Sequence, residues 1–304
     1  MYVRRSLKKN DILYLIFWVD KMNYVGAHIN KESGSILKTI QKVQNNNGNA
    51  LQIFVSNPRS IQLPNIQTYS NISKEVYTYC NENNFKLVVH ASYTINLATD
   101  PKQGKKVCDL KDCYWINLLL NQLYVSNILG SIGVVVHVGK NKDKIQGLKN
   151  QYIAVKYIIS QLQQNEIASK LIIETPAGVG NELLNTIEEF LLFYNMFSVE
   201  EKKYLGICFD TAHVWSAGYD INEYYKTMAK ENANDIVVIH YNNSKKEQGS
   251  NVDVHDTIFQ GKIPLDMLQY FIRNLQHNPL IILETPSTKF QKEIDWVKHN
   301  LYKD

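Results

Sequence analysis

Short apolar runs recur along this chain at a regular interval, each bounded by polar segments. Eight such runs occupy residues 24–28, 51–55, 86–90, 133–137, 170–174, 205–210, 235–240 and 279–284. They are nearly continuous and rich in β-branched residues, a pattern typical of strands buried on both faces of a parallel sheet. Successive runs lie about 37 residues apart on average, which leaves room for one helix and two loops between neighbouring strands.

The segments between these runs carry helical patterns. Residues 33–44, 184–197 and 263–276 place apolar side chains at intervals of three and four, and Pro264 stands near the first turn of the last segment. Eight repeats of strand and helix predict an α/β fold, a closed (β/α)8 TIM barrel, rather than an open sheet. We expect this barrel to form a single domain over residues 23–304, preceded by an N-terminal extension of residues 1–22.

Ionisable side chains stand at the ends of seven of the eight predicted strands. They are His28, His90, His137, Glu174, Asp210, His240 and Glu284, and His213 and His255 also follow strand ends. In TIM barrels the carboxyl ends of the strands form the face that carries the active site. Although a lone histidine at such a position is more often a hydrogen-bonded core residue, carboxylates and imidazoles crowded together would repel one another unless cations lay among them. The pattern therefore predicts a metal site at this face.

The types of side chain narrow the choice of metal. Imidazoles mixed with carboxylates, without cysteine, suit Zn²⁺, Mn²⁺ or Fe²⁺ better than Ca²⁺ or Mg²⁺, and the number of histidines favours zinc. Asp253 and His255 stand two residues apart, so an extended backbone would project both to one side. Together with His213 they would hold one ion and leave a coordination position open, an arrangement typical of catalytic rather than structural sites.

The composition bears on membrane association and cellular compartment but does not indicate a function. The chain has 304 residues with 33 basic and 29 acidic side chains, a formal net charge of +4 that does not by itself predict nucleic acid binding. Its longest apolar run, residues 12–19, is too short to span a bilayer, so we expect no membrane association. Four cysteines without CxxC spacing favour a reducing, intracellular compartment, and do not distinguish nucleus, cytoplasm and virion.

Six motifs make the sequence resemble the endonuclease IV family of apurinic/apyrimidinic endonucleases. They are HASYTINLA (90–98), VVVHVG (134–139), IIETPAGVG (172–180), CFDTAHVWSAGYD (208–220), GSNVDVHD (249–256) and IILET (281–285), and they follow the family's order over residues 22–300. The resemblance implies a site with three zinc ions. One ion would be held by His90, His137 and Glu174, a second by Glu174, Asp210, His240 and Glu284, and the third by His213, Asp253 and His255.

The resemblance also implies a reaction and a partner. With Glu174 as the central catalytic residue, the enzyme would hydrolyse the phosphodiester 5′ to an abasic site in double-stranded DNA, leaving a 3′-hydroxyl and a 5′-deoxyribose phosphate. This step belongs to base excision repair, and we expect the enzyme to act as a monomer. Arg59, Tyr93, Lys140 and Lys245 match positions or loops expected to contact DNA. Thr94 and Val254 depart from the family's commoner leucine and arginine.

Two other functions compete with this one. A metal-dependent sugar isomerase or epimerase on the same barrel would use Glu174, Asp210, His240 and Glu284 alone, and would have no evident need for the five further ligands. A DNA-binding protein without catalysis would use the lysine-rich loops that follow the strands, at residues 102–106, 140–144, 245–246 and 262. Such loops are more often merely solvated when taken alone.

Overall fold

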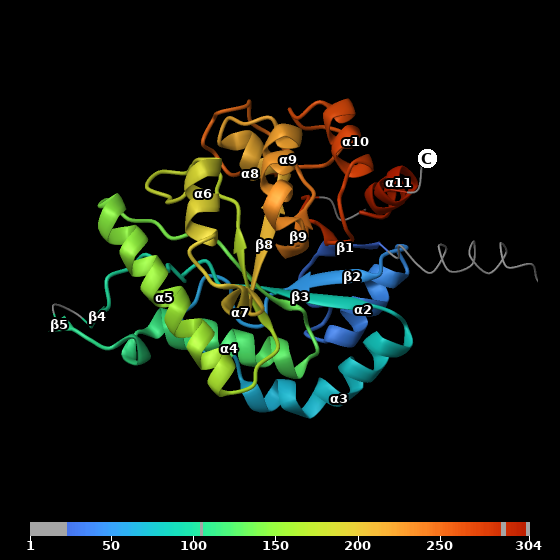
Figure 1. The fold of residues 1–304 in the computed structure, drawn as a ribbon. Coiled ribbons are helices and arrows are strands. Elements are labelled where there is room, and N and C mark those ends of the chain that lie inside the picture. Colours follow the sequence, from blue (N-terminus) through green and yellow to red (C-terminus); the bar gives the residue numbers. More distant parts are fainter. Residues whose placement is uncertain (1–22, 104–105, 287–289, 302–304) are drawn as a thin grey trace, which may run out of the picture.

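The eight predicted strands close into a barrel in the computed structural model of the chain (Figure 1). The structure describes residues 23–103, 106–286 and 290–301, so the extension at residues 1–22 lies outside the described residues. The barrel strands are β1 (Tyr24–His28), β2 (Ala50–Ile53), β3 (Lys86–His90), β6 (Gly133–Val136), β7 (Lys170–Glu174), β8 (Leu205–Asp210), β9 (Ile236–His240) and β12 (Leu280–Leu283). Each pairs in parallel with its neighbours, in the order β1-β12-β9-β8-β7-β6-β3-β2. The predicted (β/α)8 barrel is confirmed.

Helices lie outside the strands and cover the barrel wall (Figure 1). They are α2 (Ile36–Gln44), α3 (Ile66–Glu82), α4 (Tyr114–Ile128), α5 (Lys144–Gln164), α6 (Ile187–Tyr194), α7 (Val199–Lys202), α8 (Thr211–Ser216), α9 (Ile221–Asn232), α10 (Leu265–Arg273) and α11 (Gln291–Leu301), with 3-10 turns at Leu110–Asp112 and Ala233–Asp235. In the described part of the chain, none of these helices combines the length and apolar character needed to cross a bilayer.

Three helices are shorter than the sequence pattern predicts, and local backbone geometry explains two of the differences. α2 begins at Ile36 rather than residue 33 because Ser33 and Gly34 have φ angles of 48° and 73°, and Ser35 caps the helix. α6 begins at Ile187 rather than residue 184 because Leu184 has a φ of 59°. A residue with a left-handed backbone conformation cannot belong to the helix, and the spacing of apolar residues does not reveal such a conformation.

Two apolar layers hold the barrel together. The interior is filled by side chains contributed by seven of the strands: Ala50, Val88, Val135, Ile172, Cys208, Val238, Leu280 and Ile282. A larger layer packs the outer faces of the strands against the helices. β1 approaches β2 so closely that a Cβ on Gly26 would stand 1.6 Å from the carbonyl oxygen of Ala50. Only glycine fits this position, and the close pairing fixes the carboxyl end of β1 next to that of β2.

Two short antiparallel strand pairs lie outside the barrel. The antiparallel pair β10 (Asn243–Ser244) and β11 (His255–Asp256) follows β9, and a second pair, β4 (Lys102–Gln103) and β5 (Lys106–Val107), projects from the side of the barrel (Figure 1). Between β8 and β9 the register shifts at Ile207 and Cys208. Such irregularities re-aim side chains near active sites.

Candidate metal centre

The carboxyl ends of the strands carry the ionisable residues singled out in the sequence. β1, β3, β7, β8 and β9 end on His28, His90, Glu174, Asp210 and His240, and His137 and Glu284 directly follow β6 and β12. Because all these strands are parallel neighbours in one closed barrel, their ends meet around one axis. The structure groups most of these side chains into three overlapping clusters.

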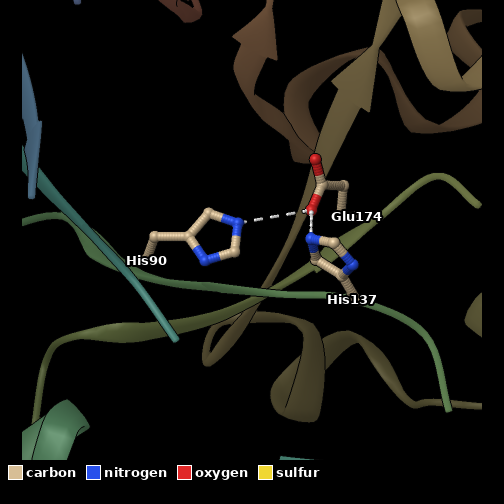
Figure 2. Close-up of side chains that lie close together, drawn as sticks. All are labelled: His90, His137 and Glu174. Atoms are coloured by element: carbon tan, nitrogen blue, oxygen red, sulfur yellow. Dashed lines mark ion pairs between the residues drawn. The ribbon is translucent and has the colours of Figure 1, made fainter. Parts of the chain in front are cut away.

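The first cluster joins His90, His137 and Glu174, whose candidate ligand atoms lie within 4.8 Å of one another (Figure 2). Nε2 of His90 lies 3.6 Å from Oε2 of Glu174, and Nε2 of His137 lies 3.2 Å from the same oxygen. Nδ1 of His90 donates to the carbonyl oxygen of Ala91 at 2.9 Å. Since a carbonyl only accepts, Nδ1 carries a proton, and Nε2 is the nitrogen that faces the cluster.

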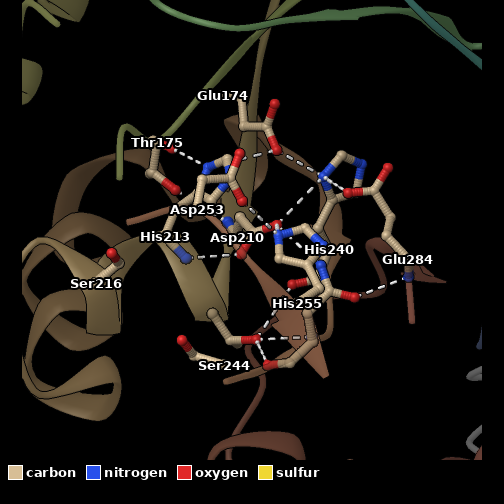
Figure 3. A network of polar contacts seen from close by, with 12 residues as sticks. Glu174, Thr175, Asp210, His213, Ser216, His240, Ser244, Asp253, His255 and Glu284 are labelled. Atoms are coloured by element: carbon tan, nitrogen blue, oxygen red, sulfur yellow. Dashed lines mark hydrogen bonds and ion pairs between the residues drawn. The ribbon is translucent and has the colours of Figure 1, made fainter. Parts of the chain in front are cut away.

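The second cluster joins Glu174 to Asp210, His240 and Glu284 (Figure 3). Nδ1 of His240 lies 2.7 Å from Oε1 of Glu174, 3.1 Å from Oε2 of Glu284 and 3.6 Å from Oδ2 of Asp210. Glu174, Asp210 and His240 are each 1% exposed or less. Glu174 thus turns one carboxylate oxygen to each of the two clusters.

The third cluster joins His213 and His255 to Asp210, with Asp253 beside it (Figure 3). Oδ1 of Asp253 lies 3.3 Å from Nε2 of His213 and 3.2 Å from Nε2 of His255. Nδ1 of His213 donates to the carbonyl oxygen of Thr175 at 2.8 Å, so Nε2 is the nitrogen that faces Asp253. Asp253 is the most exposed of these side chains, at 35%, and completes the cluster from the solvent side.

Asp210 has two structural bonds besides its place in two clusters. Its Oδ1 accepts from the backbone N–H of His213 at 2.8 Å and caps α8, which starts at the next residue. Its Oδ2 accepts from Nδ2 of Asn242 at 2.9 Å, and Oδ1 of Asn242 accepts from the backbone N–H of Glu284 at 2.7 Å. The helix cap therefore places His213 and Asp210 together, which explains why a buried strand ends in a carboxylate.

Glu293 on α11 anchors the loop that carries His255. This carboxylate is 2% exposed and accepts from the backbone N–H of Ile258 and from the hydroxyl of Thr285, each at 2.8 Å. Thr285 directly follows Glu284. One buried side chain thus ties together two segments that carry candidate ligands.

Unpaired buried atoms indicate, independently of any sequence motif, that the clusters can hold divalent metal ions. Among the described residues, Oε2 of Glu174 and Nε2 of His255 are buried polar atoms without a hydrogen-bond partner. Buried polar atoms are rarely left unpaired, because desolvation without compensation costs about 1–3 kcal/mol. Both atoms point into clusters of imidazole nitrogens and carboxylate oxygens, the donor set that Zn²⁺, Mn²⁺ and Fe²⁺ prefer.

Without ions, protons must balance these charges. Burial alone would lower the pKa of His213 and His255, but the neighbouring carboxylate of Asp210 outweighs it and, with Asp253, raises the pKa of His255 to about 9 and that of His213 well above its usual range. Burial opposes ionisation of Glu174, yet the surrounding imidazoles hold its pKa well below the usual range. In the metal-free centre the raised pKa values favour imidazolium at His213 and His255, whereas burial lowers the pKa of His28 and His137.

The pattern of ionisable strand ends does not predict two neutral residues of the site. β2 is the strand without an ionisable residue at its predicted end, and it supplies Gln52, a fully buried amide whose Oε1 lies 2.9 Å from Nε2 of His240. In the sequence, Gln52 is recognisable only as the polar residue inside the apolar run LQIFV. Cys208 lies near Glu174 and His240, and burial raises the pKa of its thiol, which stays protonated.

A cavity of about 1370 Å³ opens over the clusters. Of the residues proposed to contact DNA, Tyr93, Lys140 and Lys245 line this cavity, whereas Arg59 lies outside its lining and is exposed. Tyr93 is 56% exposed, and its ring centroid lies 5.8 Å from that of His90. Burial and nearby carboxylates raise the pKa of Tyr93 to about 12, so its phenol keeps its proton at neutral pH.

Several lysines expected around the rim are paired with carboxylates. Lys140 lies 3.2 Å from Oε1 of Glu182, Lys102 2.8 Å from Asp100, and Lys262 2.9 Å from Glu247; Lys144 pairs with Glu189. Lys31 and Lys42, which sequence reasoning did not select, also line the cavity. The rim therefore holds a mixed set of charges rather than a uniform basic band.

Known proteins resemble this chain over most of its length. A family model described as a xylose isomerase-like TIM barrel matches residues 40–300. The protein is 30% identical to the probable endonuclease 4 of Buchnera aphidicola subsp. Baizongia pistaciae over 288 residues, which cover 91% of this chain and 99% of that protein. It is 29% identical to the apurinic-apyrimidinic endonuclease 1 of Plasmodium berghei over 304 residues, covering 93% of this chain and 56% of that longer protein. Endonuclease IV from Thermus thermophilus shares the fold with a TM-score of 0.69 at 22% identity, over 91% of this chain and 97% of the other.

Proposed function

Because this chain belongs to the endonuclease IV family of apurinic/apyrimidinic endonucleases, within the xylose isomerase-like TIM barrels, we propose that it cleaves DNA at abasic sites. It is a hydrolase of the nuclease type. The proposed reaction is hydrolysis of the phosphodiester 5′ to the lesion in duplex DNA, leaving a 3′-hydroxyl and a 5′-deoxyribose phosphate. The enzyme would serve base excision repair.

The three clusters support a centre of three ions, with zinc as the metal best suited to their histidine content. His90, His137 and Glu174 would hold the first ion, and Glu174, Asp210, His240 and Glu284 the second. His213, Asp253 and His255 would hold the third. When bound, such ions lower the pKa of water and neutralise the negative charge that develops on a phosphate during hydrolysis.

The single observation that carries this proposal is the position of Glu174. One of its oxygens lies 2.7 Å from Nδ1 of His240, while the other faces His90 and His137 without a hydrogen-bond partner. Glu174 would therefore contribute one carboxylate oxygen to each of the first two metal sites. We therefore assign Glu174 as the central catalytic residue.

The residues of the cavity would hold the DNA above this centre. Tyr93 keeps its proton, so its exposed phenol can donate a hydrogen bond to a phosphate oxygen or pack against the helix at the lesion. Lys140 and Lys245 would contact backbone phosphates, and Arg59 would reach the duplex from outside the cavity. Contacts of this kind give affinity without choice of sequence. A monomer suffices because every proposed ligand comes from one domain, residues 23–304.

A sugar isomerase or epimerase is the second candidate, because the family model describes a barrel named for xylose isomerase. Its chemistry would need only the quartet of Glu174, Asp210, His240 and Glu284. The additional nitrogen ligands around Glu174 and Asp253 favour the nuclease. A DNA-binding protein without catalysis would leave the burial of so many mutually repelling groups unexplained.

One experiment tests the proposal directly. The purified protein is incubated with a duplex that contains a single abasic analogue, with and without a strong chelator, and its metal content is measured by elemental analysis. We expect zinc near three ions per chain, with cleavage that the chelator abolishes. Glu174→Gln should lose at least about 10²-fold in the rate of cleavage while binding the duplex. Glu75→Gln, an exposed change on α3, serves as the control.

The outcomes separate the candidates. Fewer than two ions per chain together with an uncut duplex would favour the isomerase. Binding of abasic duplex that is unaffected by Glu174→Gln, with no cleavage by either form, would favour the non-catalytic protein.

A further inference from the structure

The barrel holds a buried amide behind the second cluster. Gln52 is fully buried on β2, and its side chain lies between His240 and Glu284. Its Nε2 donates to Oε1 of Glu284 at 2.7 Å. Since a carboxylate oxygen only accepts, the amide nitrogen must face Glu284 and the amide oxygen must face Nε2 of His240, 2.9 Å away. The amide therefore has only one orientation that satisfies both neighbours.

This orientation fixes which nitrogen of His240 faces the cluster. The carbonyl of Gln52 accepts from Nε2, so Nε2 carries a proton. The ring then presents Nδ1 to the oxygens of Glu174 and Glu284, at 2.7 and 3.1 Å. A hydrogen bond to the nitrogen remote from a metal fixes both the tautomer and the ring orientation of a histidine ligand.

The same amide and His28 fix the carboxylate of Glu284. Nδ1 of His28 lies 2.6 Å from Oε1 of Glu284, the oxygen that also accepts from Gln52. The two donors stand on neighbouring strands, because His28 on β1 and Gln52 on β2 are partners in the register. Nδ1 of His28 must carry the proton in this contact. Nδ1 of His28 and Nε2 of Gln52 are therefore both donors, and they lie 3.1 Å apart because both donate to Oε1 of Glu284. With Oε1 engaged twice, Oε2 is the oxygen left to face the cluster.

We propose that Gln52 and His28 are positioning residues for the ion bound by the second cluster. Gln52 sets the tautomer of His240, and Gln52 and His28 together set which oxygen of Glu284 binds. Neither residue would contact the ion, and neither belongs to the nine proposed ligands. The proposal rests on the proposed metal centre, and it accounts for a buried polar residue in an otherwise apolar strand.

The test measures metal affinity rather than cleavage. Protein loaded with zinc is dialysed against a graded series of chelator concentrations, and zinc per chain is measured by elemental analysis. Gln52→Met keeps the size of the side chain and removes both hydrogen bonds. His28→Leu removes one donor, whereas His28→Asn places an amide nitrogen near the position of Nδ1. His299→Leu, on α11, is the control for loss of a histidine.

We expect one ion per chain to leave Gln52→Met and His28→Leu at about 10- to 100-fold lower chelator concentration than the wild type, since loss of such a partner costs that much affinity. His28→Asn should recover most of the wild-type affinity, and His299→Leu should match the wild type. Recovery by asparagine separates a donor role from simple packing, which leucine would also supply.

Two results overturn the proposal: wild-type zinc retention in both Gln52→Met and His28→Leu, or equal losses in His28→Asn and His28→Leu. Circular dichroism of each metal-free variant checks folding, and the two His28 variants decide the question if Gln52→Met does not fold. A wild-type protein that binds no zinc would instead refute the proposed function, so the two failures are distinguishable.

Discussion

Asp210→Asn separates the structural role of Asp210 from its proposed role in binding metal. Asparagine caps helices as well as aspartate does, so the cap of α8 is not lost by the change itself. The difficulty lies at Asn242, whose Nδ2 donates to Asp210 at 2.9 Å. Asn242 cannot turn its amide around, because its Oδ1 accepts from the backbone N–H of Glu284 at 2.7 Å. The new amide at position 210 therefore faces two donors with only one acceptor oxygen.

The magnitude follows from that mismatch. Whichever way the new amide turns, either the N–H of His213 or the amide of Asn242 loses its buried acceptor, at a cost of about 1–3 kcal/mol in the free energy of unfolding. In a domain of this size that corresponds to a fall in Tm of about 2–12 °C. The variant should also bind fewer ions, because the carboxylate of Asp210 belongs to two clusters.

The assay uses thermal unfolding in the presence of chelator, followed by elemental analysis after zinc loading. The double variant Asp210→Asn with Asn242→Asp exchanges donor and acceptor between the two positions and keeps the net charge. The carboxylate introduced at position 242 can accept both from the amide now at position 210 and from the N–H of Glu284, so the Tm should return close to that of the wild type. The metal loss should persist, because the ligand oxygen has moved.

Either of two results would refute this reasoning. A single variant that unfolds at the wild-type temperature in chelator would show that Asn242 is not held as described. A double variant that regains both its Tm and its full zinc content would show that the oxygen of Asp210 is not a ligand.

The same geometry leads to three further predictions. The raised pKa of His255, about 9 against an ordinary 6.5, means that its proton stabilises the metal-free protein below about pH 6.5 and that this stabilisation is lost as the pH rises through 9. Zinc affinity should therefore rise over the same window, about tenfold per pH unit for each proton displaced; a flat affinity in chelator competition from pH 6.5 to 9.5 would contradict this. Lys245→Ala should reduce the slope of log affinity for DNA against log salt by about 0.9, measured by fluorescence anisotropy, whereas Lys203→Ala, just before β8 at the opposite end of the barrel, should not change it. Glu293→Ala should lower the free energy of unfolding by about 1–3 kcal/mol and speed hydrogen exchange at Ile258, whose N–H loses its acceptor; unchanged exchange there would rule out the role of Glu293.

The fold was accessible from the sequence because strands buried on both faces leave an unambiguous pattern. Each of the eight apolar runs became a barrel strand, and β1, β3, β7 and β8 have the predicted bounds. Helix ends were less accessible. They depend on single residues such as Leu184, whose left-handed backbone conformation no hydrophobic period encodes.

The charged residues of the candidate site could be predicted from the sequence, whereas the two neutral residues, Gln52 and Cys208, could not. His90, Glu174 and His240 stand at strand ends, where the barrel dictates their convergence. Gln52 lies one residue inside its strand and does not ionise, so a search for ionisable ends passes over it. Residue spacing alone predicts that Asp253 and His255 project to one side, but the distance from Asp253 to His213 depends on how the loop folds.

The barrel closes where its first strand meets its last. β1 pairs with β12 from Tyr24 and Leu280 to Ala27 and Leu283, and the contact between His28 and Glu284 crosses this junction. An ion in the second cluster would bind Glu284 beside β12, and Glu284 in turn holds His28 on β1, so the ion would favour the closed junction by mass action. Its removal would favour opening there, which would expose two unpaired sheet edges that other chains can extend. Self-association during storage, before any global unfolding, is therefore the expected fate of protein stripped of its metal.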